Sequence, residues 1–375
     1  MNSLATADKP ISIASPSIGE AEKRAVLEVL ESGQLAQGSV TRAFEEEFAA
    51  ATGAKEAVAV NSGTAALIVA LQAVGVREGD EVITTPFSFI ATATSIIACG
   101  ARPVFVDVEP FDGNIDVARV ADAIGPRTKA VMPVHLYGHP ARVGELASLC
   151  HERGLELVED AAQAHGATHG GKCVGTFGVG CFSFYPTKNM TTGEGGMITV
   201  NNPSVAARAR AIRNHGQTER YQHEVFGLNW RMTDIAAAIG RVQLERLGER
   251  NRARMENAAG LSDRIRAGGL LEFGVQLPNV RDGDTHVFHQ YTVRIGDRRD
   301  SVWAFLKEAG VGAAVYYPVP IHRQPIFAKL GLSEVEAPRA EEMAEAVLSL
   351  PVHPGLTQED LDQIVDTLAK ALRGL

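Results

Sequence analysis

The feature that most constrains the fold is an alternation of short apolar runs with helical runs between residues 57 and 200. The apolar runs have the length of buried strands, and the segments between them carry apolar residues at helical spacing. The predicted strands are 57–60, 81–84, 104–106, 130–134, 157–159, 181–184 and 196–200, and the predicted helices are 65–74, 91–98, 117–124 and 143–153. Such alternation predicts an α/β fold with a mainly parallel sheet covered by helices on both faces.

The remainder of the chain has a different pattern. Two amphipathic helices are expected before the alternation, at 20–31 and 40–51, and a long helix at 232–254 is expected to lead into a smaller α+β domain. In that domain we expect strands at 287–294 and 315–317 and helices at 298–309 and 358–372. The predicted division is an N-terminal arm at 1–11, a large domain at 12–254 and a small domain at 255–375.

Composition limits the possible partners. The chain has 375 residues, 45% of them apolar, which is enough for one large core and a smaller one. A net charge of −9 and a pI near 5.7 argue against a nucleic-acid or anionic-membrane surface, which would need a basic face. The uncharged run 57–76 is interrupted by the turn formers of 61–64, which favours a buried strand and helix over a membrane span.

The cysteines and the first residues predict a location. Residues 1–10 contain no long apolar run, so no signal peptide is expected. The four cysteines are widely spaced and form no Cys-x-x-Cys pair, which is typical of reduced thiols in a cytoplasmic protein. They are Cys99, Cys150, Cys173 and Cys181.

Two ionisable residues lie where predicted strands end. Asp160 follows strand 157–159, and Lys188 follows strand 181–184 in a stretch without charge between Lys172 and Glu194. In a parallel sheet, ligands bind at the carboxyl ends of the strands. A buried lysine can form a Schiff base with an aldehyde cofactor, and an acid can hold the cofactor's pyridine nitrogen protonated. This pair predicts a pyridoxal-phosphate (PLP) enzyme, although each residue alone also suits a helix cap or a solvated surface lysine.

A phosphate site is predicted at the start of helix 65–74. Gly63 and Thr64 end a strand and open this helix, where unpaired backbone N–H groups can hold a phosphate. Ser183 is placed to add a hydroxyl group. The simpler alternative is a glycine turn with a threonine cap.

Several motifs together resemble one known family. They are Glu159-Asp160-Ala161-Ala162-Gln163-Ala164-His165-Gly166, Ser183-Phe184-Tyr185-Pro186-Thr187-Lys188-Asn189, Gly193-Glu194-Gly195-Gly196 and Gly227-Leu228-Asn229-Trp230-Arg231-Met232-Thr233-Asp234. In this order, with further matches from Pro16 to Pro354, they resemble the DegT/DnrJ/EryC1/StrS family of PLP-dependent sugar aminotransferases.

The resemblance implies fold type I and an obligate homodimer whose active sites lie between the subunits. It also implies glutamate as amino donor and a keto nucleotide-sugar as acceptor. Lysine at position 188 favours amination, because the family's dehydratase branch has histidine there. The implied cofactor residues are Lys188 as the Schiff-base lysine, Asp160 at the pyridine nitrogen, Phe89 stacked on the ring, Gln163 near the phenolic oxygen, Gly63, Thr64 and Ser183 at the phosphate, and Asn229 reaching the phosphate from the partner subunit.

The substrate end is less specific. Residues 316–325 resemble the loop of family members that act on 3-keto nucleotide sugars, which implies that Tyr317 and His322 line the sugar or nucleotide site. The alternative is a rigid proline-rich loop with an exposed histidine. His215 is a candidate for the nucleotide phosphates. His286 and His289 are interpreted as core or surface histidines, and no metal site is predicted.

Three rival functions remain open from sequence. The acceptor is a 4-keto sugar in the first, and a cyclitol or aminobenzoate-type ring in the second. The third is a non-enzymatic regulator, against which stand the acidic balance and the absence of a basic helix-turn-helix pattern.

Overall fold

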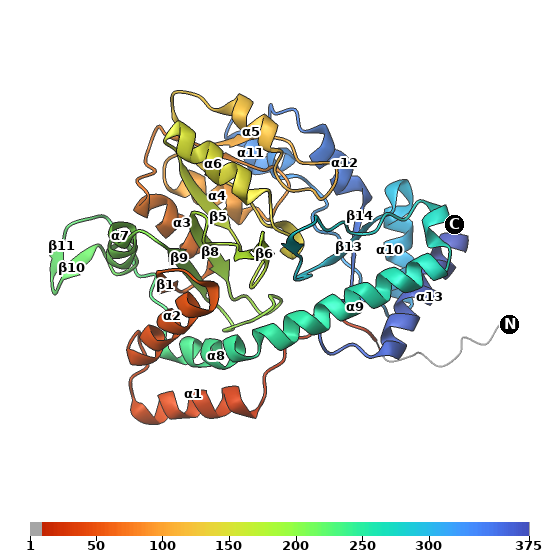
Figure 1. Ribbon diagram of the computed structural model, residues 1–375, viewed down its shortest axis with the longest axis horizontal. Coiled ribbons are helices and arrows are strands. Elements are labelled where there is room, and N and C mark those ends of the chain that lie inside the picture. The colour runs from red at the N-terminus through yellow and green to blue at the C-terminus, as the bar shows by residue number, and fades with distance from the viewer. Residues whose placement is uncertain (1–9, 375) are drawn as a thin grey trace.

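The computed structural model describes residues 10–374 and is built around a seven-stranded sheet (Figure 1). The strands, in spatial order, are β1 (Glu56–Val60), β9 (Gly196–Val200), β8 (Val179–Ser183), β5 (Glu156–Asp160), β4 (Thr128–Met132), β2 (Glu81–Thr84) and β3 (Arg102–Phe105). The five strands from β8 to β3 are parallel, and β9 runs antiparallel to both β8 and β1. The predicted mainly parallel sheet is therefore confirmed.

The antiparallel pair β8 and β9 determines where Lys188 lies. Parallel neighbours need a crossover element, whereas antiparallel neighbours can be joined by a loop alone. The loop 184–195 makes this connection and contains Lys188. It leaves the sheet at the carboxyl end of β8, next to the carboxyl end of β5, where Asp160 lies.

Helices cover both faces of the sheet (Figure 1). Val58 and Val60 pack on one side with α3 (Gly63–Ala73), α4 (Ala91–Ala98) and α7 (Pro203–Arg213). Ala57 and Ala59 point to the other side, where α2 (Ser39–Thr52) covers them, and α5 (Val117–Ala123) and α6 (Val143–Arg153) continue this layer. The two-residue alternation is the side-chain period of a strand buried on both faces.

The carboxylate of Asp234, which is distant in the sequence, caps the start of α2. Gly38 occupies the cap position and has no side chain to offer, but Asp234 accepts hydrogen bonds from Gly38 N at 2.7 Å and Thr41 N at 2.9 Å. The Thr41 hydroxyl donates to the same carboxylate at 2.6 Å. Asp234 is the first residue of α8 (Asp234–Glu245), so this carboxylate fixes α8 against α2.

The helix predicted at 232–254 is two helices. It breaks at Arg246 between α8 and α9 (Leu247–Ala267). Gln243 before the break and Arg250 after it both donate to the Ser17 carbonyl at 3.0 Å. The break lets both side chains reach this one acceptor. Their hydrogen bonds hold the segment that leads into α1 (Glu20–Ser32).

A second apolar core lies in the C-terminal part. It is formed by α9, α10 (Arg299–Glu308), α13 (Gln358–Gly374) and the antiparallel pair β13 (Tyr291–Arg294) and β14 (Val347–Leu350). Two strand predictions were wrong here. Strand β13 is only the second half of 287–294, because Phe288 has a φ of 43° and residues 287–290 turn to bond the loop at 137–138. Residues 315–317 form no strand, and only Ala314 bridges to Ser349.

The predicted domain division remains a prediction. Helix α9 runs unbroken through residues 254 and 255, and residues 316–347, with α11 (Pro325–Lys329) and α12 (Pro338–Ala346), share apolar clusters with the sheet-side residues Phe87 and Phe105. Of the predicted arm, residues 1–9 lie outside the described residues, and Ile11 bridges to Val311 of the C-terminal core.

Short strands complete the molecule. Strands β12 (Asp284–Thr285), β6 (Thr168–His169) and β7 (Lys172–Cys173) form a small sheet. Strands β10 (Gln217–Glu219) and β11 (Gln222–His223) form a hairpin that projects from the body beyond α7 (Figure 1). Within residues 10–374, no helix is both long enough and apolar enough to span a membrane.

Candidate active site

Lys188 is half-buried in the loop 184–195, and its amine is shielded from solvent. Its backbone N–H donates to the Tyr185 carbonyl at 2.9 Å, and burial lowers the pKa of its ammonium group from 10.5 to about 8, an effect that the Asp160 carboxylate partly offsets. Loss of a proton near neutral pH is what a Schiff-base lysine needs.

Asn189 and Asn251 anchor this loop by hydrogen bonds. The Asn189 side-chain amide donates to Asn251 Oδ1 at 2.8 Å and to the Val287 carbonyl at 2.9 Å. Asn251, on α9, donates in turn to the His165 carbonyl at 2.8 Å. The lysine loop, the segment after β5 and α9 are thereby tied together.

Asp160 is fully buried at the end of β5. Its Oδ2 accepts from the Thr92 hydroxyl at 2.8 Å, and its Oδ1 accepts from Ala162 N at 3.2 Å. Burial raises the pKa of this carboxyl group, and the bonds from Thr92 and Ala162 and the charge of Lys188 act in the opposite direction. No described helix begins after Asp160, so the alternative reading as a helix cap is wrong.

Gly63 and Ser183 meet at the start of α3. A methyl group added at Gly63 would lie 2.6 Å from the Ser183 Cβ, so only glycine allows this approach. The helix begins at Gly63 and is capped by Ser62, whose hydroxyl accepts from Ala65 N at 3.1 Å. Thr64 is thus not the cap. Within the described chain, the N–H groups of Gly63 and Thr64 are left without a backbone acceptor and suit a phosphate beside the Ser183 hydroxyl.

Gln163 joins the cofactor-side residues to the substrate-side loop. Its Oε1 accepts from Tyr137 N at 2.8 Å, and its Nε2 donates to the Tyr317 hydroxyl at 3.2 Å. The Phe89 ring is 57% exposed, and its centroid lies 6.3 Å from that of Tyr317. Of the predicted residues, Asp160, Lys188, Gln163, Tyr317 and Phe89 therefore lie in one connected group.

The other predicted substrate residues lie elsewhere. His322 is buried, accepts or donates a hydrogen bond with Glu341 at 2.9 Å, and packs with Phe105, so it is not the exposed histidine of the alternative reading. His215 is exposed at the base of the β10–β11 hairpin. Asn229 is also exposed there and is joined by its carbonyl to the Asn61 side chain at 3.4 Å. The roles of these three residues remain predictions.

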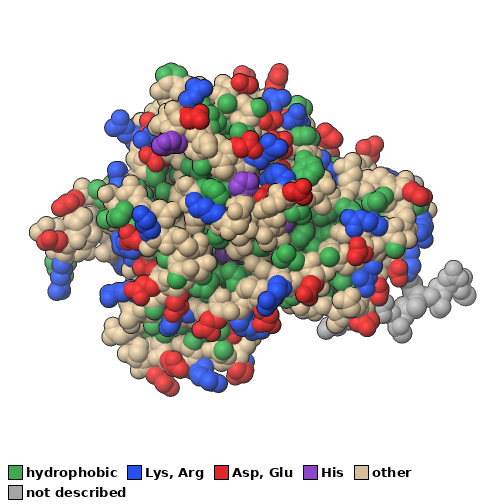
Figure 2. Space-filling model, viewed as in Figure 1, with side chains coloured by type: hydrophobic (Ala, Val, Ile, Leu, Met, Phe, Trp, Pro, Cys, Tyr) green, Lys and Arg blue, Asp and Glu red, His purple; other side chains and the backbone are tan. Residues whose placement is uncertain are grey.

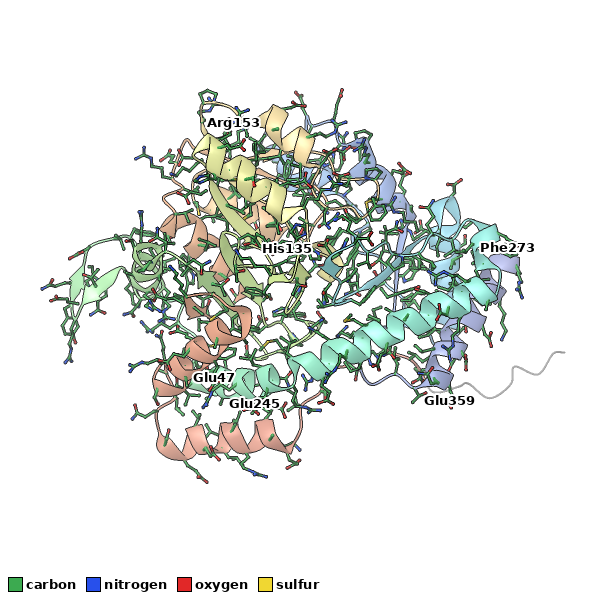
Figure 3. The ribbon with its side chains drawn as sticks, viewed as in Figure 1. Glu47, His135, Arg153, Glu245, Phe273 and Glu359 are labelled. Carbon is green, nitrogen blue, oxygen red and sulfur yellow. The ribbon has the colours of Figure 1, made fainter. Side chains whose placement is uncertain are left out.

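Sequence reasoning missed several buried partners, including Thr92, His135 and Tyr137. His135 lies near the centre of the molecule (Figure 3) and binds Glu159 at 3.1 Å. Glu159 also accepts from Gly175 N at 2.6 Å and Phe177 N at 2.8 Å, so it fixes the segment before β8. His135 and Tyr137 follow strand β4, and the strand-end rule that selected Asp160 would also have selected them.

A cavity of about 450 Å³ reaches the Lys188 loop from the side of α8 and α9. Arg246, Arg250 and Arg254 line one wall of it. Arg250 lies 3.7 Å from Glu22, and Arg246 lies 3.9 Å from Glu249, whereas Arg254 donates to the carbonyl groups of residues 288 and 289. Elsewhere, Figure 2 shows acidic and basic side chains interspersed over the visible face.

The residues present fit PLP. A buried amine that loses its proton near neutral pH, a buried carboxyl group beside it and a glycine-lined helix start are the three groups that hold the aldehyde, the pyridine nitrogen and the phosphate. All three follow the carboxyl ends of strands β8, β5 and β1, which lie at the same edge of the sheet.

Comparison with known proteins gives the same answer. The profile of the DegT/DnrJ/EryC1/StrS aminotransferase family matches residues 16–369. A pleiotropic regulatory protein of Geobacillus stearothermophilus is 44% identical over 93% of this chain and 94% of its own. A UDP-N-acetyl-3-dehydro-α-D-glucosamine 3-aminotransferase of Acidithiobacillus ferrooxidans is 40% identical over 92% of each chain.

A solved structure matches the fold as closely. The crystal structure of DesV from S. venezuelae, in complex with a ketimine intermediate, superposes with a TM-score of 0.89 at 38% identity, over 94% of each chain. The fold, the Lys188–Asp160 pair and these matches lead to one conclusion. The chain belongs to the DegT/DnrJ/EryC1/StrS family and is a PLP-dependent aminotransferase.

Proposed function

We propose that this enzyme transfers the amino group of glutamate to the keto group of a nucleotide-linked hexose, with C3 as the favoured position. The observation that carries the proposal is the buried Lys188 amine beside Asp160, which gives the chemistry of amino-group transfer. The sugar acceptor is supported by the name of the Acidithiobacillus relative, which acts at C3, and such a reaction belongs to amino-sugar biosynthesis.

Each residue has a stated task in this reaction. When bound, PLP supplies an electron-accepting ring that stabilises negative charge on the substrate carbon. Asp160 holds the proton on the ring nitrogen, and Gly63, Thr64 and Ser183 hold the phosphate. Lys188, freed when the donor's amino group binds, would take the proton from the donor carbon and return it to the carbon on the other side of the donor nitrogen. Its pKa of about 8 leaves roughly a tenth of the amine unprotonated at pH 7, a far larger fraction than a lysine with the ordinary pKa of 10.5 would have.

The donor and acceptor are both anionic. The cavity with Arg246, Arg250 and Arg254 on its wall suits the carboxylates of glutamate or the phosphates of a nucleotide. We place the reaction in the cytoplasm, which is supported by four cysteines that are all free thiols.

The enzyme is proposed to work as a homodimer. The β10–β11 hairpin and the segment after it expose Tyr221 by 79% and Phe226 by 76%, the two highest values among the exposed large apolar side chains of residues 10–374, and we infer that a partner covers them. Asn229 lies in the same segment. We therefore assign it to the phosphate of the partner subunit's cofactor.

The first experiment identifies the reaction. Purified enzyme is expected to be yellow, and borohydride is expected to fix the cofactor onto Lys188. A panel of 3-keto and 4-keto nucleotide sugars, a keto cyclitol and an aminobenzoate-type precursor is then offered with glutamate, and the aminated product is identified by NMR. Amination of a keto sugar by a colourless Lys188→Ala variant would refute the mechanism.

The regulator alternative is tested by the same preparation. A relative carries a regulatory name, so the alternative is a specific one. Absence of turnover with every acceptor, together with retained cofactor, would favour it.

A further inference from the structure

Tyr137 lies at the meeting point of three segments, and nothing in the reaction described above uses it. It follows β4 in a left-handed conformation with a φ of 59°. Its carbonyl accepts from Gln290 N at 3.2 Å, and the neighbouring Gly138 carbonyl accepts from Val287 N at 3.0 Å. A non-glycine residue in this region is strained, and such residues persist where the surroundings hold them in place.

The backbone of Tyr137 fixes the orientation of the Gln163 amide. Its N–H donates to Gln163 Oε1 at 2.8 Å, so the NH₂ group of that amide must point the other way. There it donates to the Tyr317 hydroxyl at 3.2 Å. Gln163 consequently presents hydrogen-bond donors, not an acceptor, toward the active site.

The side chain of Tyr137 contacts the loop that contains Tyr316 and Tyr317. Its hydroxyl donates to the Tyr316 carbonyl, and the ring is buried with Phe87, Leu136 and Met343. One residue thus binds Tyr316 directly and Tyr317 through Gln163. The two bonds come from different parts of Tyr137 and reach adjacent residues of the loop.

We propose that Tyr137 is a positioning residue that sets Tyr317 for recognition of the keto acceptor. Tyr317 contacts Gln163 and Phe89, which are assigned to the cofactor. The hydroxyl of Tyr137 bonds neither of them but the carbonyl of Tyr316, so we assign this bond to the acceptor half of the reaction and not to the donor half. The inference rests on the proposed function, because it assigns Tyr317 to the acceptor.

The test separates the two halves of the reaction. Wild-type enzyme and Tyr137→Phe, each loaded with PLP, are first converted with glutamate, and excess donor is removed. The aminated enzyme is then mixed with UDP-N-acetyl-3-dehydroglucosamine or with 2-oxoglutarate, and the cofactor absorbance is followed by stopped flow. For the variant, we expect the rate constant at low sugar concentration to fall about tenfold, the worth of one buried hydrogen bond. The rates with glutamate and 2-oxoglutarate should be unchanged.

Tyr291→Phe is the matched control. Tyr291 is also a buried tyrosine, but its hydroxyl bonds Ser262 at 2.8 Å in the C-terminal core. We expect this variant to leave both acceptors unaffected. In a double-mutant cycle that combines Tyr137→Phe with Tyr317→Phe, the losses in rate with the sugar should be less than additive, because both substitutions act on the same loop.

The outcomes are distinguishable. Equal losses with sugar and 2-oxoglutarate would mean that Tyr137 merely supports the fold, and no loss with either would mean that its hydroxyl does nothing; both overturn the inference. A wild-type enzyme that turns over glutamate and 2-oxoglutarate but no nucleotide sugar overturns the proposed function, and this inference with it.

Discussion

At the scale of single residues, the buried Lys188 amine has a cost that can be measured. Its folded pKa of about 8 lies below the ordinary 10.5, so between these values the unfolded chain binds more protons than the folded one. The unfolding free energy of the cofactor-free enzyme should therefore rise with pH over this window. Lys188→Met carries no such amine and should be more stable than wild type at pH 7, with the difference shrinking as the pH approaches 10.5.

Urea unfolding of both cofactor-free proteins at several pH values checks this expectation. A difference that stays constant with pH would show that the amine is solvated in the folded state. The same Lys188→Met protein should have no transaminase activity at any pH, because the methionine side chain has no amine to form the Schiff base or to move a proton.

Asp160 is expected to act through its charge. In Asp160→Asn the side chain can still accept from Thr92, but it can no longer hold a proton on the pyridine nitrogen, and we expect kcat to fall by roughly 10²–10³-fold. Thr92→Val is the matched comparison, since it removes the hydroxyl and leaves the carboxylate. We expect Thr92→Val to lower kcat less than Asp160→Asn does. Steady-state kinetics with a fixed donor and acceptor measure both, and equal losses would contradict a charge-based role.

Strand-end reasoning predicted the residues whose chemistry is unusual for their place in the chain. Lys188, Asp160, Gly63 and Ser183 could be selected because each lies at the carboxyl end of a predicted strand. The residues that hydrogen-bond to this site could not be selected in the same way. Thr92 and Asn251 are ordinary residues in helical segments, and they acquire a role only through partners 68 and 62 residues away in the chain.

At the scale of elements, most helices and strands were predictable from periodicity, and two of the errors share one cause. The strand predicted at 287–294 has the right alternation, but its first half is pulled away by backbone bonds to Tyr137 and Gly138. The helix predicted at 232–254 breaks where Gln243 and Arg250 converge on Ser17. In both places a tertiary contact outweighs the local pattern, and such contacts are not visible in a single sequence.

The cap of α2 gives an element-scale prediction. Asp234→Ala removes the acceptor for Gly38 N, Thr41 N and the Thr41 hydroxyl, and it leaves the start of α2 without a cap. We expect a loss of about 2 kcal/mol in unfolding free energy, as for other caps and buried charged acceptors. Asp366→Ala, at an exposed position of α13, should change it by less than about 0.5 kcal/mol. Urea denaturation compares the two, and similar values would show that α2 does not depend on Asp234.

At the scale of the whole molecule, the exposed β10–β11 hairpin and the position of Asn229 lead to a prediction about shared sites. Asn229 lies at the base of a projecting segment, and within residues 10–374 it makes hydrogen bonds only through its backbone and to Arg231 N. If it completes the partner's phosphate site, Asn229→Ala removes activity from the partner's Lys188, not from its own. Lys188→Ala and Asn229→Ala proteins should then each be nearly inactive alone.

Mixing these two variants under conditions that exchange subunits tests the arrangement. A mixed dimer has one site with both an intact Lys188 and an intact Asn229 from the other chain, so random pairing should restore about a quarter of wild-type activity. If Asn229 served its own chain, one site of the mixed dimer would lack Lys188 and the other would lack Asn229. Neither site would be intact, and the activity would equal the mean of the two variants. Phe226→Asp in the Lys188→Ala chain is the control, because a charge on the exposed face should block pairing and with it the recovery. Recovery that survives this change would refute the assignment of the hairpin to the subunit interface.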